Sequence, residues 1–279
     1  MNLAEKKKIL CKLGNILAHL AKGDAWSGYE LGINEEEYQN LQELVKTVHI
    51  YNGWFKEEQV KKSFLSLSTW LNEDALNTWL EAYPSKENSK KKVGIIMAGN
   101  IPLVGFHDFI SVFLAGHISV IKLSSDDQHL LPAILKTLSL FNDEIWNWVE
   151  IVDRPMKEFD AVIATGSNNS ARYFESYFAK YPHIIRKNRT SIAVLKGDES
   201  KEEIAELGKD IFDYFGLGCR NVSQVWIPKD FEINRFYEGI YDFHDIVNHN
   251  KYANNYDYNK AVLLMNQEQI LDNGFLLIK

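Results

Sequence analysis

From residue 93 onwards, short apolar runs alternate with longer amphipathic segments, and no other feature constrains the fold as strongly. The segments between these runs have the apolar spacing of helices, as in residues 128–141. Repeated strand–helix units of this length predict an α/β fold in which helices cover the faces of a parallel sheet. The apolar runs cover residues 93–98, 118–122, 149–152, 160–165 and 191–196.

Residues 1–90 show helical patterns only. Apolar side chains recur at helical spacing, as in Ile9, Leu13 and Leu17. This spacing is typical of helices that turn one face toward a core. We therefore expect a helical region that packs on the sheet domain and takes no part in chemistry.

Charge and cysteine count exclude several classes of protein. The 279 residues carry a formal charge of −7, which disfavours sequence-independent binding of nucleic acid. Only two cysteines occur, Cys11 and Cys219, so a disulfide framework or a cysteine zinc cluster is not available and no metal site is expected. Without a secretory signal or a long apolar run, the sequence predicts a cytoplasmic protein with no membrane insertion.

Polar residues follow three of the predicted strands directly. Asn100 comes after the first strand, Lys122 ends the second, and Gly166 and Ser167 follow the fourth. Ligands of parallel sheets bind beyond the carboxyl ends of the strands, so these positions are candidates for a binding site. Structural explanations stay open: Lys122 can reach solvent from its strand end, and Ser167 can cap a helix while still allowing phosphate to bind.

For Asn100 the structural alternative is a helix N-cap. Pro102 suits the first turn of a helix, which we expect to run from this proline to Gly116. An asparagine two residues before such a proline is a common cap.

Cys219 lies in a glycine-containing turn, residues 215–221, between a predicted helix and the apolar strand at 222–227. Ser200 and Glu203 form a capping box at the start of that helix. Glycines allow the sharp bend that exposes a sulfur, and the backbone N–H groups of such a bend can stabilise negative charge that develops on a carbonyl oxygen. The alternative is a buried cysteine after the end of the helix.

Four segments match the pattern of one enzyme superfamily in the right order. Together they resemble the aldehyde dehydrogenase superfamily and, within it, the acyl-CoA reductases related to the fatty-acid reductases of bacterial luminescence systems. The resemblance covers the chain from about residue 93 to its end. The segments are residues 98–102 (AGNIP), 115–122 (AGHISVIK), 164–167 (ATGS) and 218–219 (GC).

The resemblance implies an aldehyde dehydrogenase-like fold with a Rossmann-type nucleotide-binding sheet. Together with the helical pattern of residues 1–90, it divides the chain into a helical region at 1–90, a NAD(P)-binding domain at 91–195 and an α/β catalytic domain at 196–279. Residues 273–279 resemble the beginning of a strand. We therefore expect a piece of a longer protein with an incomplete catalytic domain.

The resemblance also assigns roles to the candidate residues. Cys219 would be the nucleophile that takes the acyl group from a thioester, and Asn100 would stabilise the oxyanion. Lys122 would contact the adenosine ribose of a nicotinamide cofactor, and Gly166 with Ser167 would lie under its pyrophosphate.

Two departures from the family pattern refine this interpretation. Where aldehyde-oxidising members carry the glutamate that activates water, residues 185–190 (IRKNRT) contain no carboxylate. Where NAD-preferring members usually carry a glutamate after the ribose lysine, this chain has Ser125. The hydroxyls of Ser124 and Ser125, with Lys122, can accept a 2′-phosphate, so NADPH is favoured and NADH stays open.

The sequence thus predicts an enzyme that uses NADPH to reduce an acyl-CoA, or an acyl group on another carrier, to the aldehyde. One alternative is a catalytically degenerate scaffold that binds nucleotide or partner proteins. Another is an oxidative aldehyde dehydrogenase, which the missing glutamate disfavours. Acyl chain length stays open, as does assembly, either as a homo-oligomer or with a partner enzyme that supplies acyl groups.

Overall fold

The computed structural model describes residues 1–83, 89–153 and 155–279. The chain divides into two compact units, Met1–Asn188 and Arg189–Lys279. Each unit contains its own cluster of buried apolar side chains, so each is described by itself.

The first unit is built on a five-stranded sheet in the order β3-β2-β1-β4-β5, and all its strand pairs are parallel. The α/β fold with a parallel sheet is therefore confirmed. Strand β5 was not predicted, because its four residues, HIIR, contain only two apolar side chains. The strands are β1 (Lys92–Ile96), β2 (Ile118–Lys122), β3 (Val149–Ile151), β4 (Ala161–Thr165) and β5 (His183–Arg186), and the helices are α1 (Leu3–Lys22), α2 (Glu35–Thr47), α3 (Glu57–Trp70), α4 (Glu73–Glu81), α5 (Phe106–Leu114), α6 (Leu130–Phe141) and α7 (Asn168–Phe178).

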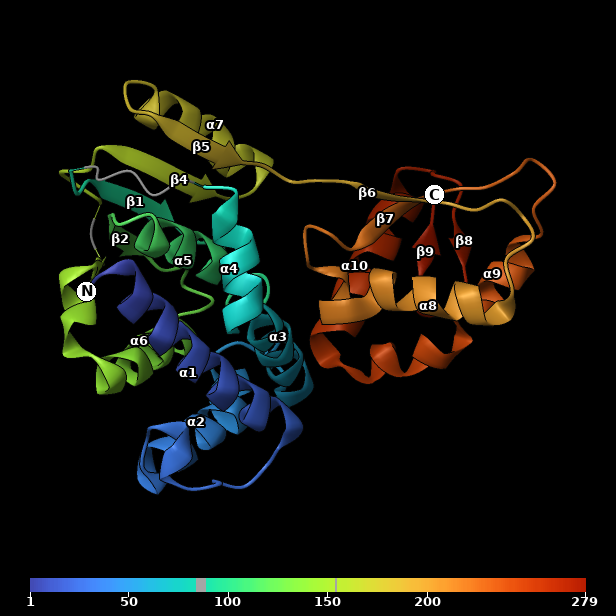
Figure 1. Cartoon of the computed structure of the whole chain (residues 1–279). Helices are drawn as coiled ribbons and strands as arrows, with labels where there is room; N and C mark the ends of the chain where they lie inside the picture. The colour runs from blue at the N-terminus through green and yellow to red at the C-terminus, as the bar shows by residue number, and fades with distance from the viewer. Residues whose placement is uncertain (84–88, 154) are drawn as a thin grey trace. The chain divides into compact units, whose positions relative to one another are not determined.

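Both faces of this sheet are covered (Figure 1). The chain runs outward from β1 through β2 to β3 and then returns to β4 on the other side of β1. Because crossovers between parallel strands are right-handed, α5 and α6 lie on one face and α7 on the other. Two neighbouring residues of β2 pack on opposite faces of the sheet. Ile121 belongs to the larger core cluster, and Val120 packs in a smaller cluster with Phe178 of α7.

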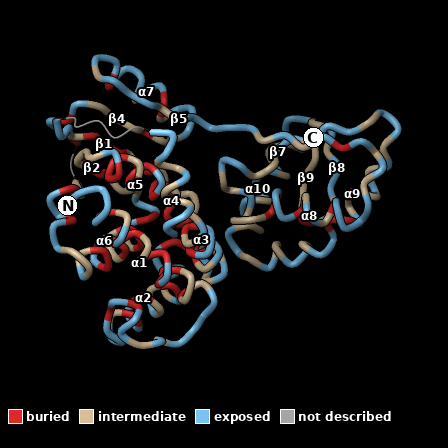
Figure 2. Tube along the Cα trace, in the orientation of Figure 1, coloured by how far each residue is buried: buried red, intermediate tan, exposed pale blue. Residues whose placement is uncertain are grey.

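Helices α1 to α4 share the larger core with the sheet. The expected stripe of α1 is confirmed, since Ile9, Leu13 and Leu17 are all buried (Figure 2). Lys6 is buried as well, and its amine donates a hydrogen bond to the Phe113 carbonyl oxygen at the end of α5 (2.7 Å). Burial and the charge of Lys90 lower the pKa of Lys6 to about 8. The helical region is therefore part of the first compact unit.

The second unit contains the parallel pair β6 (Ser191–Val194) and β7 (Val222–Trp226), joined through α8 (Lys201–Phe212). The capping box of Ser200 and Glu203 at the start of α8 is confirmed. Strand β6 pairs with β7 and so belongs to this unit, which begins at Arg189. The expected boundary between the nucleotide-binding and catalytic domains, at residues 195 and 196, therefore lies inside the unit. The division of the chain into three regions stays a prediction. The remaining elements are α9 (Ile233–Gly239), α10 (Asn250–Met265) and the antiparallel pair β8 (Leu271–Asp272) and β9 (Leu277–Ile278).

Candidate active site

The carboxyl ends of β1, β2 and β4 lie at one edge of the first unit's sheet. The strand order reverses between β1 and β4, since β1 leads to β2 on one side and β4 follows on the other. Such a reversal is where parallel sheets bind ligands. The chain reaches Asn100 after β1 and Gly166 after β4, and β2 ends at Lys122. The structure therefore places all three residues at this edge.

The loop that carries Asn100, residues 97–105, is a series of turns. Leu103 takes the left-handed conformation (φ 56°), and α5 begins only after Gly105. The expectation that the helix begins at Pro102 is therefore wrong, because a left-handed residue cannot continue a right-handed helix. The alternative role of Asn100 as the cap of this helix is wrong as well, since Gly105 occupies the cap position.

The loops after β1 and β2 are in close contact. A Cβ atom on Gly99 would lie 2.6 Å from the Oγ atom of Ser124, so only glycine permits this approach. The Ser124 hydroxyl accepts a hydrogen bond from the Asp126 N–H group (3.2 Å), and Ser125 beside it is exposed. The structure thus brings the loop of Asn100 against one of the candidate ribose residues.

Lys122 and Asp127 point to different partners. The Lys122 amine donates a hydrogen bond to the Asp153 carbonyl oxygen (3.2 Å), which keeps the partly buried side chain at the carboxyl edge. Asp127 is buried, and its Oδ2 atom accepts a hydrogen bond from the Leu103 N–H group (3.0 Å). The Asp127 carboxylate is therefore committed to the neighbouring loop.

Gly166 and Ser167 connect β4 to α7. Ser167 is the N-cap of this helix, and its hydroxyl accepts a hydrogen bond from the Ser170 N–H group (3.2 Å), so the capping role is confirmed. A Cβ atom on Gly166 would lie 2.9 Å from Cβ of Ser170. The first N–H groups of a helix have no partner within the helix and attract anions, so this helix start is suited to a phosphate.

Cys219 lies in the second unit, in the turn between α8 and β7, and it is exposed. The alternative of a buried structural cysteine is therefore wrong. Tyr214, Phe215 and Gly216, which precede it, all have left-handed backbones (φ 51°, 59° and 73°). Since a non-glycine residue in this conformation costs about 1 kcal/mol, other contacts must hold the turn.

Asn221 supplies such contacts. Its Oδ1 atom accepts a hydrogen bond from the Gly218 N–H group (2.7 Å), and its Nδ2 atom donates to the carbonyl oxygens of Asp210 and Asp213 (both 2.9 Å). The side chain thus ties the Cys219 turn to the end of α8. No motif in the sequence predicted this role, although an asparagine beside glycines is typical of a turn.

The segment without a glutamate begins at the end of β5. Arg186 donates hydrogen bonds to both carboxylate oxygens of buried Asp108 on α5 (2.6 and 2.5 Å). Burial by itself raises the pKa of Asp108, but hydrogen bonds from His107 and Arg186 outweigh burial and lower it. This carboxylate is therefore held ionised in an ion pair, and it is a poor base.

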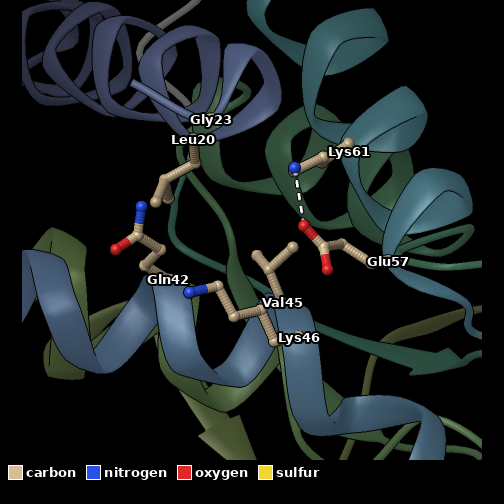
Figure 3. Close-up of a pocket in the computed structure, with 7 residues that line it drawn as sticks. All are labelled: Leu20, Gly23, Gln42, Val45, Lys46, Glu57 and Lys61. Carbon is tan, nitrogen blue, oxygen red and sulfur yellow. Dashed lines mark ion pairs between the residues drawn. The ribbon is translucent and has the colours of Figure 1, made fainter. Parts of the chain in front are cut away.

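A cavity of about 140 Å³ lies elsewhere in the first unit, among the N-terminal helices (Figure 3). It contains an ion pair between Lys61 and Glu57 (2.6 Å), and none of the candidate site residues lines it. Its lining contains neither a cysteine nor a serine. The lining residues are Leu20, Gly23, Gln42, Val45, Lys46, Glu57 and Lys61.

The described residues contain neither a candidate metal site nor a candidate membrane-spanning helix. Among residues 1–83, 89–153 and 155–279, no three His, Cys, Asp or Glu side chains come together in a way that could hold a metal ion. No helix in the same part of the chain is long and apolar enough to cross a membrane.

The family model of acyl-CoA reductase (LuxC) matches residues 12–236 of the chain. No curated protein sequence matches the chain. Solved structures with a similar fold include an E. coli NADP-dependent enzyme (14% identity, TM-score 0.65, 88% of this chain and 52% of that chain). A second is a Sinorhizobium meliloti NAD-dependent aldehyde dehydrogenase (13% identity, TM-score 0.65, 88% of this chain and 49% of that chain). A third is a Bacillus cereus aldehyde dehydrogenase in complex with NAD⁺ (15% identity, TM-score 0.58, 88% of this chain and 50% of that chain).

At these identities the likeness is one of fold, and the expected aldehyde dehydrogenase-like fold is confirmed. The chain spans about half the length of these solved structures.

Proposed function

The chain belongs to the acyl-CoA reductase (LuxC) family, and from this premise we propose that it reduces an acyl-CoA to the aldehyde through a thioester on Cys219. The observation that supports this most directly is the position of Cys219, exposed beside a left-handed stretch of backbone in a turn that Asn221 holds in place. A nucleophilic thiol has to be accessible to its substrate and fixed in direction.

In the first step the Cys219 sulfur bonds to the carbonyl carbon of the substrate thioester. The bond between this carbon and the CoA sulfur breaks, and CoA leaves as a thiol with the proton that Cys219 gives up. The backbone N–H group of Cys219 and, by family resemblance, the Asn100 amide donate hydrogen bonds to the oxyanion. Each such donor typically contributes about 10²–10³ in rate.

The residues at the carboxyl edge of the first unit suit a dinucleotide. The N-terminus of α7, capped by Ser167, attracts a pyrophosphate, and Gly166 lets the helix start close to its strand. The Lys122 amine, held at the same edge, would bind ribose hydroxyls. A nicotinamide cofactor, when bound, supplies the hydride that reduces the Cys219 thioester to the aldehyde.

We further propose that NADPH is preferred over NADH. Both kinds of cofactor occur within this fold, since one similar structure is described as NADP-dependent and another contains NAD⁺. The preference therefore rests on this chain's own residues. Ser125 is exposed beside Ser124 and offers a hydroxyl, and the Lys122 amine lies at the same edge of the sheet.

Replacing Ser125 with glutamate is expected to weaken NADPH binding by at least about tenfold, because the new carboxylate would repel the 2′-phosphate. NADH, which lacks this phosphate, should lose much less affinity. Fluorescence titration of each reduced cofactor with both proteins gives the two ratios, and Ser125→Gln is the uncharged control of similar size. An equal loss for both cofactors would place Ser125 outside the ribose site.

The experiment that tests the proposed function is a reductase assay with a panel of acyl-CoAs of increasing chain length. We expect NADPH to be consumed, which is measured as a fall in its absorbance, and an equal amount of aldehyde to form. A protein that binds NADPH but consumes none with any acyl-CoA, and whose Cys219 reacts slowly with iodoacetamide near neutral pH, would instead be the degenerate scaffold. The assembly state, an acyl-supplying partner and the cytoplasmic location stay predictions.

A further inference from the structure

The loop that carries Asn100 cannot hold its shape by itself. Leu103 is left-handed (φ 56°), which is unfavourable for a leucine and persists only where the surroundings impose it. No regular element includes residues 97–105, and α5 starts after them. The conformation of this loop therefore depends on contacts from other elements.

The Met97 N–H group at the start of the loop donates a hydrogen bond to the Lys122 carbonyl oxygen of β2 (3.1 Å), and three side chains of other segments contact the loop further along. The Ser63 hydroxyl, buried on α3, donates a hydrogen bond to the Pro102 carbonyl oxygen (2.8 Å). The Asp127 carboxylate accepts the Leu103 N–H group (3.0 Å), and Gly99 lies against Ser124. These contacts act on Pro102 and Leu103, which lie between Asn100 and α5, and on Gly99, directly before Asn100.

The Asp127 contact is the unusual one of the three. The side chain is 8% exposed, and within the described part of the chain its Oδ1 atom is buried without a hydrogen-bond partner. Burying a carboxylate with one oxygen unpaired is costly, and burial raises the pKa of Asp127 to about 6 even though the N–H groups of Leu103 and Leu130 oppose this. A carboxylate, however, makes a hydrogen bond to an N–H group roughly twice as strong as a neutral acceptor does.

The segment that carries Asp127 is itself anchored. Buried Asn52, which follows α2, donates a hydrogen bond from Nδ2 to the Asp126 carbonyl oxygen (3.0 Å). The restraint on the Asn100 loop thus reaches from the N-terminal helical region through Asp126 and Asp127 to Leu103.

We propose that Asp127 is a positioning residue for acyl transfer: its bond to the Leu103 N–H group sets the backbone of residues 97–105 and so the direction of the Asn100 amide. This inference rests on the oxyanion role of Asn100 in the proposed function. Asp127 itself touches neither the substrate nor the reacting atoms in this proposal.

The test is a double-mutant cycle on the rate at which purified protein takes the acyl group from radiolabelled acyl-CoA in a single turnover. Asp127→Ala is expected to slow this transfer by about tenfold, a fraction of the 10²–10³ that an oxyanion donor contributes. Asp127→Asn keeps an acceptor oxygen but loses the charge, so it should recover only part of the loss. In an Asn100→Ala background, Asp127→Ala should change the rate by less than about twofold, since there is no amide left to direct.

The matched control is Asp160→Ala. The Asp160 carboxylate also accepts a backbone N–H group, that of Lys92 (2.8 Å), but Lys92 begins β1 at the opposite end of the strand from Asn100. This variant should transfer the acyl group at the wild-type rate. A readout independent of activity is amide hydrogen exchange, in which Asp127→Ala should speed exchange of the Leu103 N–H group by about tenfold or more while β1 keeps its protection.

The outcomes separate this inference from the function on which it rests. Equal losses from Asp127→Ala with and without Asn100 would overturn the positioning role alone. Faster exchange throughout the first unit, with Asp127→Asn as slow as Asp127→Ala, would also overturn it by assigning Asp127 to stability. An Asn100→Ala variant that transfers acyl groups at the wild-type rate would overturn both the oxyanion role of Asn100 and this inference.

Discussion

Cys219→Ser is expected to lower acyl transfer to the protein by at least about 10³-fold in the rate of acyl-enzyme formation. A serine hydroxyl stays protonated near neutral pH and is a far weaker nucleophile than a thiolate. The turn itself should persist, because Asn221 and the backbone hold it and the Cys219 side chain is exposed. NADPH binding should therefore remain nearly unchanged.

The matched control for this variant is Cys11→Ser, since Cys11 is the other cysteine in the chain. It is half-buried on α1, and burial raises the pKa of its thiol, so it is expected to be unreactive. Protein incubated with radiolabelled acyl-CoA and separated on a denaturing gel shows which variant retains the label. Comparable labelling of Cys219→Ser and the wild type would mean that Cys219 is not the nucleophile.

The second large effect is the lifetime of the acyl-enzyme. Without NADPH we expect radiolabelled acyl groups to accumulate on the protein as a thioester that hydroxylamine cleaves. Hydrolysis needs a base, and residues 185–190 offer only the cations Arg186, Lys187 and Arg189 in place of the family's glutamate. Asp108, the carboxylate bound to Arg186, has a lowered pKa and is held in its ion pair, so it does not replace that base.

Adding NADPH should discharge the label as aldehyde, which distinguishes a productive acyl-enzyme from a side product. Chromatography of the released label separates aldehyde from free fatty acid. Efficient labelling followed by release of fatty acid as fast as NADPH is consumed would contradict the prediction, because it requires an activated water and hence a base elsewhere. That outcome would favour the oxidative aldehyde dehydrogenase.

Local signals in the sequence predicted local structure well where short-range hydrogen bonds decide it. The capping box of Ser200 and Glu203 and the cap at Ser167 depend on residues three positions apart, and both are present. The parallel sheet followed from the alternation of strands and helices. The helix start near Pro102 was predicted wrongly, because the contacts that keep this segment in turns come from Ser63 on α3 and from Asp127, far away in the sequence.

The residue types at the strand ends can be read from the sequence alone, and they identified the candidate residues Asn100, Lys122, Gly166 and Ser167. The sequence also determined the glycine-containing turn of Cys219, since backbone bends depend on the residues within them. That Asp127 and Ser63 hold the loop of Asn100 became visible only in the folded chain. A buried polar group must find its partner wherever the fold brings one, and sequence spacing carries no record of that distance.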